Sequence, residues 1–237
     1  PQVTRVFDKI YRLIAGRANP DALVRKVVMG LNWTVAVVAD GDGNIATGLC
    51  YSHTNVPRTL PWSGTLVGRR VGEIIPWQLS WNSAESAVAT AVINADINLR
   101  EILCASAQIL ENTAPGHLRV FAHFLANEEL IPNNAHVAII GHYPGIDTLS
   151  HGRQLTILER NPQPGDLPDT AAEQVLPTAD WVFITASSIA NKTLPRLLEL
   201  STNAKVVLMG PSLPWLAEWR EFGVDYLAGV QVGDAPQ

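Results

Sequence analysis

Residues 136–166 read HVAIIGHYPGIDTLSHGRQLTILERNPQPGD, and they contain the clearest indication of the fold class. The apolar run 137–140 ends abruptly at Gly141, which is typical of a buried parallel strand that enters a turn. After a gap with room for about a turn and a half of helix, a second apolar strand at 155–158 ends at Glu159. A strand, a glycine turn, a helix and a strand make the first βαβ unit of a doubly wound sheet.

The same alternation of strands and helices continues to the end of the chain, which predicts a parallel α/β sheet. The predicted strands are 137–140, 155–158, 181–185, 205–209 and 225–229, and the predicted helices are about 145–151, 170–176, 193–201 and 213–222.

The part of the chain before this sheet has a different pattern. Apolar residues from Val3 to Ile14 recur at helical spacing, which predicts an opening helix. An Asp-Gly turn at 40–44 separates the β-rich runs 34–39 and 45–51, which predicts a hairpin.

A long helix is predicted to begin after Asn82, where Glu85 three positions later completes the pattern of a capping box. Its apolar stripe consists mostly of small residues, so another element must approach it closely. We therefore expect an α+β domain over residues 1–112 and a Rossmann-like α/β domain over residues 113–237.

The composition narrows the class of protein. The chain of 237 residues is 47% hydrophobic, and it is long enough to bury a substantial core. The net charge is −5 and no Lys/Arg run exceeds two residues, so we expect neither nucleic-acid nor membrane partners. No apolar run reaches the length of a membrane-spanning helix. Cys50 and Cys104 provide no disulfide framework, and we expect a cytoplasmic protein with reduced thiols.

Ligands of doubly wound sheets bind beyond the carboxyl ends of the strands, so the residues that follow each strand are the site candidates. The turn 141–145 lies where a Rossmann turn binds a diphosphate, and Glu159 lies where an acid usually holds a ribose 2′-hydroxyl. The fingerprint is incomplete, because Tyr143 replaces a glycine and Pro144 lacks an N–H group. Classical NAD binding is therefore not favoured.

Hydroxyl-rich turns follow two later strands, at Thr185-Ala-Ser-Ser188 and at Gly210-Pro-Ser212. Hydroxyls and backbone amides that converge at this edge suit a polar or anionic ligand. Serine and threonine are also common in such turns because they cap the following helix. Both interpretations of Ser187, Ser188 and Ser212 stay open.

The sequence contains no GxSxG, HExxH or CxxC motif, so it identifies neither a nucleophile nor a zinc site. Of the six histidines, His142 is best placed for binding because it lies on the glycine turn. Cys50 and His53 could share a metal only if the chain turns sharply between them, and packing roles are favoured. Three tryptophans around the irregular loop 52–66 are candidate pocket walls: Trp62, Trp77 and Trp81.

Several motifs, taken together, resemble the DUF364 family, whose members are described as heavy-metal chelation proteins. They are VAIIGHYP at 137–144, ERNP at 159–162 with Gly165-Asp166, LPxAD at 176–180 and GPS at 210–212. The segments SWN at 80–82 and INA at 93–95 resemble the DUF4213 domain that precedes it. The resemblance covers most of residues 30–234. It implies an enolase-N-terminal-like α+β domain, a Rossmann-like domain and a ligand site in the cleft between them.

The resemblance and the strand-end positions together select the candidate cleft residues. They are Glu85, Asn94, Gly141, His142, Tyr143, Glu159, Asp166, Ser187, Gly210 and Ser212. Glu85, Asp166 and His142 are the candidate metal ligands, and this donor set suits a hard or borderline divalent cation. A heavy metal would instead favour thiolate, so the identity of a divalent transition metal stays open. Glu85 has helix capping as its alternative role.

Three functions are compatible with these residues. The first is binding or processing of a metal ion or a metal–organic ligand in the interdomain cleft. The second is an enzyme that uses a nucleotide or S-adenosylmethionine, with Glu159 on the ribose. The third is a non-catalytic sensor of a small anion. A homo-oligomer is compatible with all three, and the sequence does not decide whether a reaction is catalysed.

Overall fold

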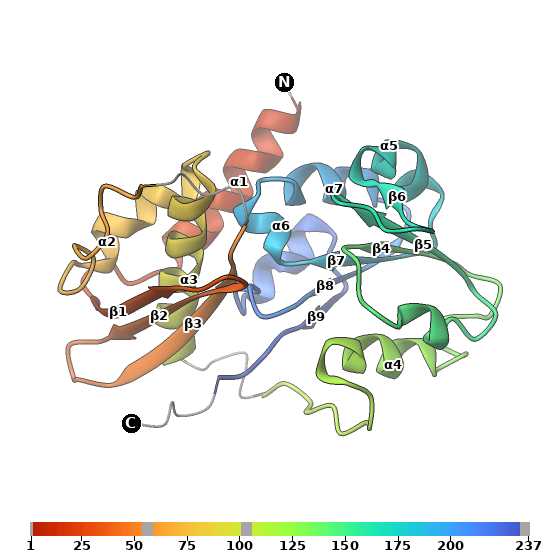
Figure 1. The fold of residues 1–237 in the computed structure, drawn as a ribbon, viewed down its shortest axis with the longest axis horizontal. Coiled ribbons are helices and arrows are strands. Elements are labelled where there is room, and N and C mark those ends of the chain that lie inside the picture. Colours follow the sequence, from red (N-terminus) through yellow and green to blue (C-terminus); the bar gives the residue numbers. More distant parts are fainter. Residues whose placement is uncertain (1, 54–58, 101–105, 233–237) are drawn as a thin grey trace.

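The computed structural model of the protein describes residues 2–53, 59–100 and 106–232. It contains a three-stranded antiparallel sheet and a six-stranded parallel sheet. In Figure 1 the smaller sheet lies at the left of the molecule and the larger sheet at its centre and right. The predicted fold class, an α+β part followed by a parallel α/β part, is therefore confirmed.

The N-terminal part consists of α1 and a sheet that packs on one long helix. Its elements are α1 (Gln2–Gly16), β1 (Leu23–Met29), β2 (Trp33–Ala39), β3 (Ile45–Tyr51), α2 (Val71–Ile74), η1 (Ile75–Leu79) and α3 (Ser83–Leu99). The predicted opening helix, hairpin and long helix are all present. The sequence pattern does not predict strand β1, because Arg25 and Lys26 are adjacent and a bulge next to Val24 breaks the alternation of apolar and polar residues.

Local hydrogen bonds explain the predicted hairpin turn and helix start. Asp40 Oδ1 accepts the backbone N–H groups of Asp42 at 3.0 Å and Asn44 at 2.9 Å, which closes the turn between β2 and β3. Asn82 Oδ1 accepts the N–H groups of Ala84 at 3.0 Å and Glu85 at 3.5 Å, as an N-cap residue does.

The small residues of α3 permit the close approach that the sequence predicts. A Cβ atom on Gly48 of β3 would lie 2.2 Å from both the Ala91 carbonyl oxygen and the Ala95 nitrogen. Only glycine can occupy position 48 while the strand lies this close to the helix.

The C-terminal part is a doubly wound sheet. Its elements are η3 (Gly116–Leu118), α4 (Arg119–Leu125), β4 (His136–Ile140), η4 (Ile146–Leu149), β5 (Gln154–Glu159), β6 (Leu167–Pro168), η5 (Asp169–Ala171), α5 (Ala172–Val175), η6 (Leu176–Thr178), β7 (Trp181–Thr185), α6 (Ser187–Ala190), α7 (Leu194–Leu200), β8 (Lys205–Met209), η7 (Ala217–Phe222) and β9 (Tyr226–Ala228). All five predicted strands are present. The strand order β6-β5-β4-β7-β8-β9 is that of dinucleotide-binding Rossmann folds, and it reverses between β4 and β7.

Several connections differ from the predicted α-helices. The predicted helices 145–151 and 213–222 are short 3₁₀ helices, η4 and η7. Gly145 and Gly152 on either side of η4 have φ angles of +83° and +85°, so the backbone leaves the helical conformation at both ends. Strand β6 and helix α6 are too short for a periodic pattern and were not predicted.

The parallel sheet buries two apolar faces. Val137, Ile139 and Phe183 pack with α4 in one cluster. Ala138 and Val182, which alternate with them, pack with α5, α7 and the N-terminal part in a second cluster. One apolar core is thus shared by the N-terminal part and one face of the sheet. The predicted boundary at residues 112 and 113 stays a prediction.

Hydrogen bonds also join the two parts. Tyr11 of α1 donates its hydroxyl hydrogen to the Ile189 carbonyl oxygen at 2.6 Å. Asn94 of α3 donates through Nδ2 to the carbonyl oxygens of Leu49 and Ser212, both at 3.0 Å. Across residues 2–53, 59–100 and 106–232, no helix has the length and hydropathy needed to cross a membrane.

Candidate ligand-binding cleft

A cleft of about 1880 Å³ lies at the carboxyl ends of the parallel strands. The ends of β4, β5, β7 and β8 form its floor, and the end of β3 contributes residues from the N-terminal part. Seven of the predicted site residues line this cleft: Gly141, His142, Tyr143, Glu159, Ser187, Gly210 and Ser212. The strand order brings these residues together, because the carboxyl ends of parallel strands share one edge of a sheet.

Glu159 joins two of the loops around the cleft. Its Oε2 accepts the backbone N–H of His142 at 3.0 Å, and its Oε1 accepts the backbone N–H of Asn161 at 3.0 Å. The carboxylate at the end of β5 therefore holds the loop after β4 in place.

A buried carboxylate orients the imidazole of His142. Asp166 Oδ2 lies 2.9 Å from His142 Nδ1 and also accepts the backbone N–H of Gln163 at 2.9 Å. Asp166 reaches this position through a turn in which its own N–H bonds the Gln163 carbonyl and Gly165 has a φ of +101°. Its side chain is 3% exposed, whereas that of His142 is 24% exposed and lines the cleft. The predicted pair of His142 and Asp166 is therefore in contact.

Besides Asp166, two further predicted site residues lie outside the cleft lining. Glu85 is at the start of α3, where its Oε2 accepts a hydrogen bond from Ser80 Oγ at 2.5 Å. Asn94 is buried beneath the Ser212 loop, and its Oδ1 has no hydrogen-bond partner within the described residues. Asn94 thus supports the floor of the cleft.

The predicted metal ligand set of Glu85, His142 and Asp166 requires correction. Among the residues that the structure describes, no three His, Cys, Asp or Glu side chains are grouped closely enough to hold a metal ion. His142 and Asp166 are in contact, but Glu85 projects from the first turn of α3 and is bonded to Ser80. Sequence spacing could not reveal this, because the three residues come from both parts of the chain.

Cys50 does not supply the thiolate that a soft metal prefers. Its side chain is fully buried, and burial raises the pKa of the thiol to about 12, although hydrogen bonds with Ser212 and Thr90 oppose the shift. The thiol therefore stays protonated at neutral pH. Cys104 lies outside the described residues.

Histidines gather around the cleft although no motif predicts it. Four of the six line it: His53, His117, His123 and His142. They lie after the end of β3, in η3, in α4 and in the turn after β4, so their spacing in the sequence carries no signal.

His53 lies at the N-terminal side of the cleft. Burial lowers the pKa of His53, and this effect outweighs a hydrogen bond with the Ser187 backbone that raises the pKa. The ring is therefore neutral at neutral pH. Its Nε2 atom is enclosed and has no hydrogen-bond partner within the described part of the chain. Cys50, which lies three residues earlier in the chain, is fully buried in the core.

Aromatic rings line the N-terminal side of the cleft. Trp33 and Tyr51 meet edge to face with centroids 5.6 Å apart, and Tyr51 and His53 do so at 5.5 Å. The predicted wall of Trp62, Trp77 and Trp81 lies elsewhere: Trp62 packs on Trp77, and Trp81 stacks on Phe7 of α1.

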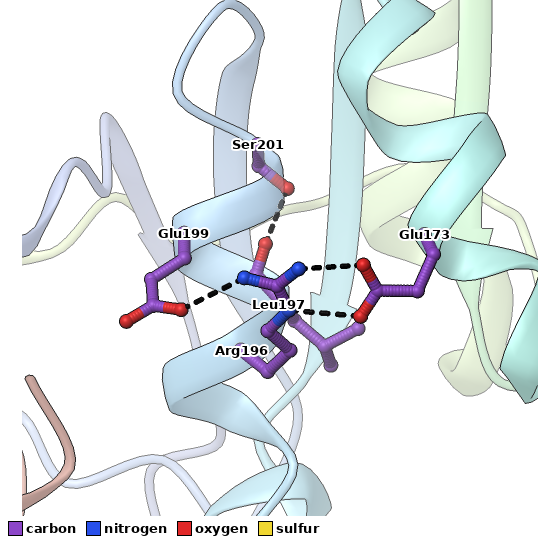
Figure 2. A network of polar contacts seen from close by, with 5 residues as sticks. All are labelled: Glu173, Arg196, Leu197, Glu199 and Ser201. Carbon is purple, nitrogen blue, oxygen red and sulfur yellow. Dashed lines mark hydrogen bonds and ion pairs between the residues drawn. The ribbon is translucent and has the colours of Figure 1, made fainter. Parts of the chain in front are cut away.

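Several charged groups at the edge of the cleft are paired with one another. Figure 2 shows Arg196 of α7 between Glu173 of α5 and Glu199, at distances of 2.5 Å and 3.1 Å. Arg160 and Asp169 form a second pair at 3.1 Å. These pairs therefore contribute little net charge to the edge of the cleft, which Arg119 and Lys192 also line.

Lys192 is the cleft residue that sequence reasoning missed. It has a left-handed φ of +69°, it is 9% exposed, and its Nζ donates to the Gln78 carbonyl at 2.5 Å and to Ser86 Oγ at 2.6 Å. Nζ also lies 4.6 Å from the ring centroid of Tyr11. Burial lowers the pKa of Lys192 to about 8. No pattern in the sequence indicates that this lysine is buried.

Two family models match this chain. Residues 11–97 match DUF4213 and residues 125–237 match DUF364, and both models carry the description "Putative heavy-metal chelation". The C-terminal part of the chain, residues 125–237, thus belongs to the DUF364 family. The DUF364 match covers the parallel sheet and its cleft loops, and the DUF4213 match covers the antiparallel sheet and most of α3.

Solved structures of the family have the same fold. A protein of unknown function from Desulfitobacterium hafniense is 29% identical with a TM-score of 0.76, and the alignment covers 94% of this chain and 85% of that one. One from Pyrococcus horikoshii is 24% identical with a TM-score of 0.73, covering 94% and 86% of the two chains. An uncharacterized protein of Methanocaldococcus jannaschii is 31% identical over 106 residues. That match spans 41% of this chain and only 41% of the relative.

Proposed function

We propose that this DUF364 protein binds a transition metal as an organic chelate, and not as a bare ion, in the cleft above the parallel sheet. The observation that carries the proposal is the arrangement of metal-ligating side chains. Four histidines line the cleft, yet the described residues contain no group of three side chains that could hold an ion by themselves. A metal whose remaining positions are filled by an organic chelator needs only one or two donors from the protein.

The size and lining of the cleft support an organic ligand. Its volume of about 1880 Å³ exceeds the roughly 300–1000 Å³ of ordinary small-molecule pockets. Trp33 and Tyr51 offer ring surfaces to a planar or apolar group, and the paired charges at the edge suit a ligand of low net charge. The family description favours a metal as the central atom.

The β4 turn argues against the alternative of a nucleotide or S-adenosylmethionine. Gly141 and His142 donate their N–H groups to the Leu158 carbonyl and to Glu159, and Pro144 has none. The turn leads into a 3₁₀ helix of four residues and not into a long helix whose N-terminus would attract a phosphate. Glu159 already accepts two backbone N–H groups, which weakens its predicted role on a ribose.

Isothermal titration calorimetry tests the proposal. Protein freed of metal by a chelator and then dialysed is titrated with Ni²⁺, Co²⁺, Zn²⁺, Cu²⁺ or Fe²⁺, each as the bare ion and as its nitrilotriacetate or citrate complex. We expect one complex per chain for at least one chelate, with at least about tenfold higher affinity than for the same bare ion, which corresponds to about 1.4 kcal/mol. Tighter binding of the bare ions would replace this proposal with ion capture.

Two further measurements separate the alternatives. Native mass spectrometry of protein purified without chelators should detect a co-purifying metal together with an organic mass. A thermal-shift panel of adenine nucleotides and S-adenosylmethionine should leave the melting temperature unchanged. Stabilisation by any of these compounds would favour the nucleotide alternative, and stabilisation by inorganic phosphate or sulfate alone would favour the small-anion sensor.

A further inference from the structure

We propose that His142 coordinates the chelated metal directly through Nε2, with Asp166 as the positioning residue that fixes the imidazole. This inference rests on the proposed function and assigns the protein's own donor atom within it. It requires a single imidazole and no cluster of ligands.

The contact with Asp166 selects the nitrogen that faces the ligand. A carboxylate only accepts hydrogen bonds, so His142 Nδ1 carries the hydrogen that is donated over 2.9 Å to Asp166 Oδ2. In the neutral imidazole the other nitrogen, Nε2, then keeps its lone pair, which is the form in which histidine binds metals. Asp166 is itself held by the backbone N–H of Gln163, so the imidazole is oriented before a ligand arrives.

The position of His142 also fits a donor role. His142 follows β4 directly after Gly141, next to the point where the strand order reverses. Its side chain is 24% exposed and lines the cleft, so a bulky chelate can reach it without removal of the residues around it. The backbone N–H of His142 is anchored on Glu159, which restrains the residue from the other side.

The other cleft histidines fit this role less well. His53 Nε2 is enclosed and therefore inaccessible to a chelate. His117 is exposed at the edge, where its Nε2 bonds the Pro144 carbonyl at 3.1 Å. His123 is exposed with its ring edge against Phe124. Within the described residues, none of these three contacts a buried carboxylate as His142 does.

Binding is a ligand exchange without electron transfer. The chelated metal releases one bound water, or one donor atom of the chelator, as the bond from Nε2 to the metal forms. The proton on Nδ1 stays in the hydrogen bond with Asp166. The metal keeps its oxidation state and its remaining chelator bonds.

Electron paramagnetic resonance with the Cu²⁺–nitrilotriacetate complex tests the assignment at one equivalent per chain. We expect the spectrum to gain the hyperfine pattern of one additional nitrogen donor, and this pattern to change when the histidines carry ¹⁵N. The variants His142→Ala and His142→Gln should lose the pattern. Asp166→Asn should retain it while the dissociation constant rises about 10- to 100-fold, as is typical when a residue that orients a metal ligand is changed.

Matched variants control for nonspecific binding to imidazole and for loss of fold. His117→Ala and His123→Ala remove other cleft histidines, and Asp169→Asn removes a carboxylate that lines the cleft and does not contact His142, so each should leave the spectrum and affinity unchanged. Circular dichroism confirms that each variant is folded, and His142→Gln serves if His142→Ala is not. An unchanged spectrum and affinity in a folded His142 variant would overturn the assignment while leaving the proposed function intact. Failure of the wild-type protein to bind any chelate in calorimetry would instead refute the proposed function.

Discussion

Two polar regions of the molecule satisfy their charged groups in opposite ways. At the cleft, Glu159 accepts backbone N–H groups and Asp166 contacts His142. At the interface with the N-terminal part, Lys192 Nζ is buried and bonds only neutral acceptors within the described residues, the Gln78 carbonyl and Ser86 Oγ. The loops after β4 and β5 are thus held by complementary charges, whereas Lys192, which lines the cleft where it meets the N-terminal part, is a cation without a carboxylate partner among the described residues.

This difference has a physical consequence. A buried charge that has only neutral hydrogen-bond partners costs free energy. Burial therefore lowers the pKa of Lys192 to about 8. The contact of the ammonium group with the Tyr11 ring and the hydrogen bonds of Nζ reduce this free-energy cost without removing it. The contribution of the interface to stability should therefore depend on pH. The contribution of the ion pairs at the cleft edge should depend instead on salt.

The largest expected effect is the pH dependence of stability that Lys192 causes. The folded protein loses this proton at about pH 8, whereas the unfolded chain keeps it up to about pH 10.5, so the unfolded state binds more protons in between. The free energy of unfolding of the wild type, relative to Lys192→Met, should therefore rise with pH across this window by up to about 3 kcal/mol. Urea denaturation of both proteins at pH 7, 8, 9 and 10 measures this difference.

A second lysine provides the control for this pH profile. Lys205 is exposed and bonded to Asp225, which raises its pKa, so it keeps its proton across the same window. Lys205→Met should therefore give a profile parallel to that of the wild type. If the Lys192→Met profile is also parallel, the buried cation does not control the interface.

A smaller effect is expected where the interface and the cleft meet. Ser212 Oγ is buried and accepts the backbone N–H of Tyr51 at 2.8 Å. Ser212→Ala leaves that N–H without its partner, and the free energy of unfolding should fall by about 1–2 kcal/mol. Urea denaturation checks this, with the partly exposed Ser187→Ala as a control that should change stability by less than about 0.5 kcal/mol. Equal losses in both variants would show that the Tyr51 contact contributes nothing specific.

The smallest effect should come from the edge of the cleft. Arg196 pairs with Glu173 and Glu199 in solvent (Figure 2), where water and salt screen the attraction. Arg196→Gln should lower the melting temperature slightly in low salt and leave it unchanged in 1 M NaCl. Differential scanning calorimetry at both salt concentrations measures this, and a salt-independent loss would mean that Arg196 packs as well as pairs.

The fold class follows from local patterns in the sequence, because periodic burial and turn chemistry act over short stretches of chain. Alternation of apolar runs with glycine turns predicted the five strands of the doubly wound sheet, and Asn82 predicted the start of α3. The sequence also placed Gly141, Glu159 and Ser212 at one edge, since parallel strands end together. Elements of a few residues, such as β6 and α6, carry no period and were missed.

Which side chains face one another depends on tertiary packing. It joined His142 to Asp166, separated Glu85 from both, and buried Lys192 against α3. These contacts link residues that lie far apart in the chain, and each depends on how the N-terminal part packs against the parallel sheet. The spacing of residues in a sequence indicates which side chains share a face of one helix or one strand. The direction of a side chain across an interface depends instead on how the elements pack.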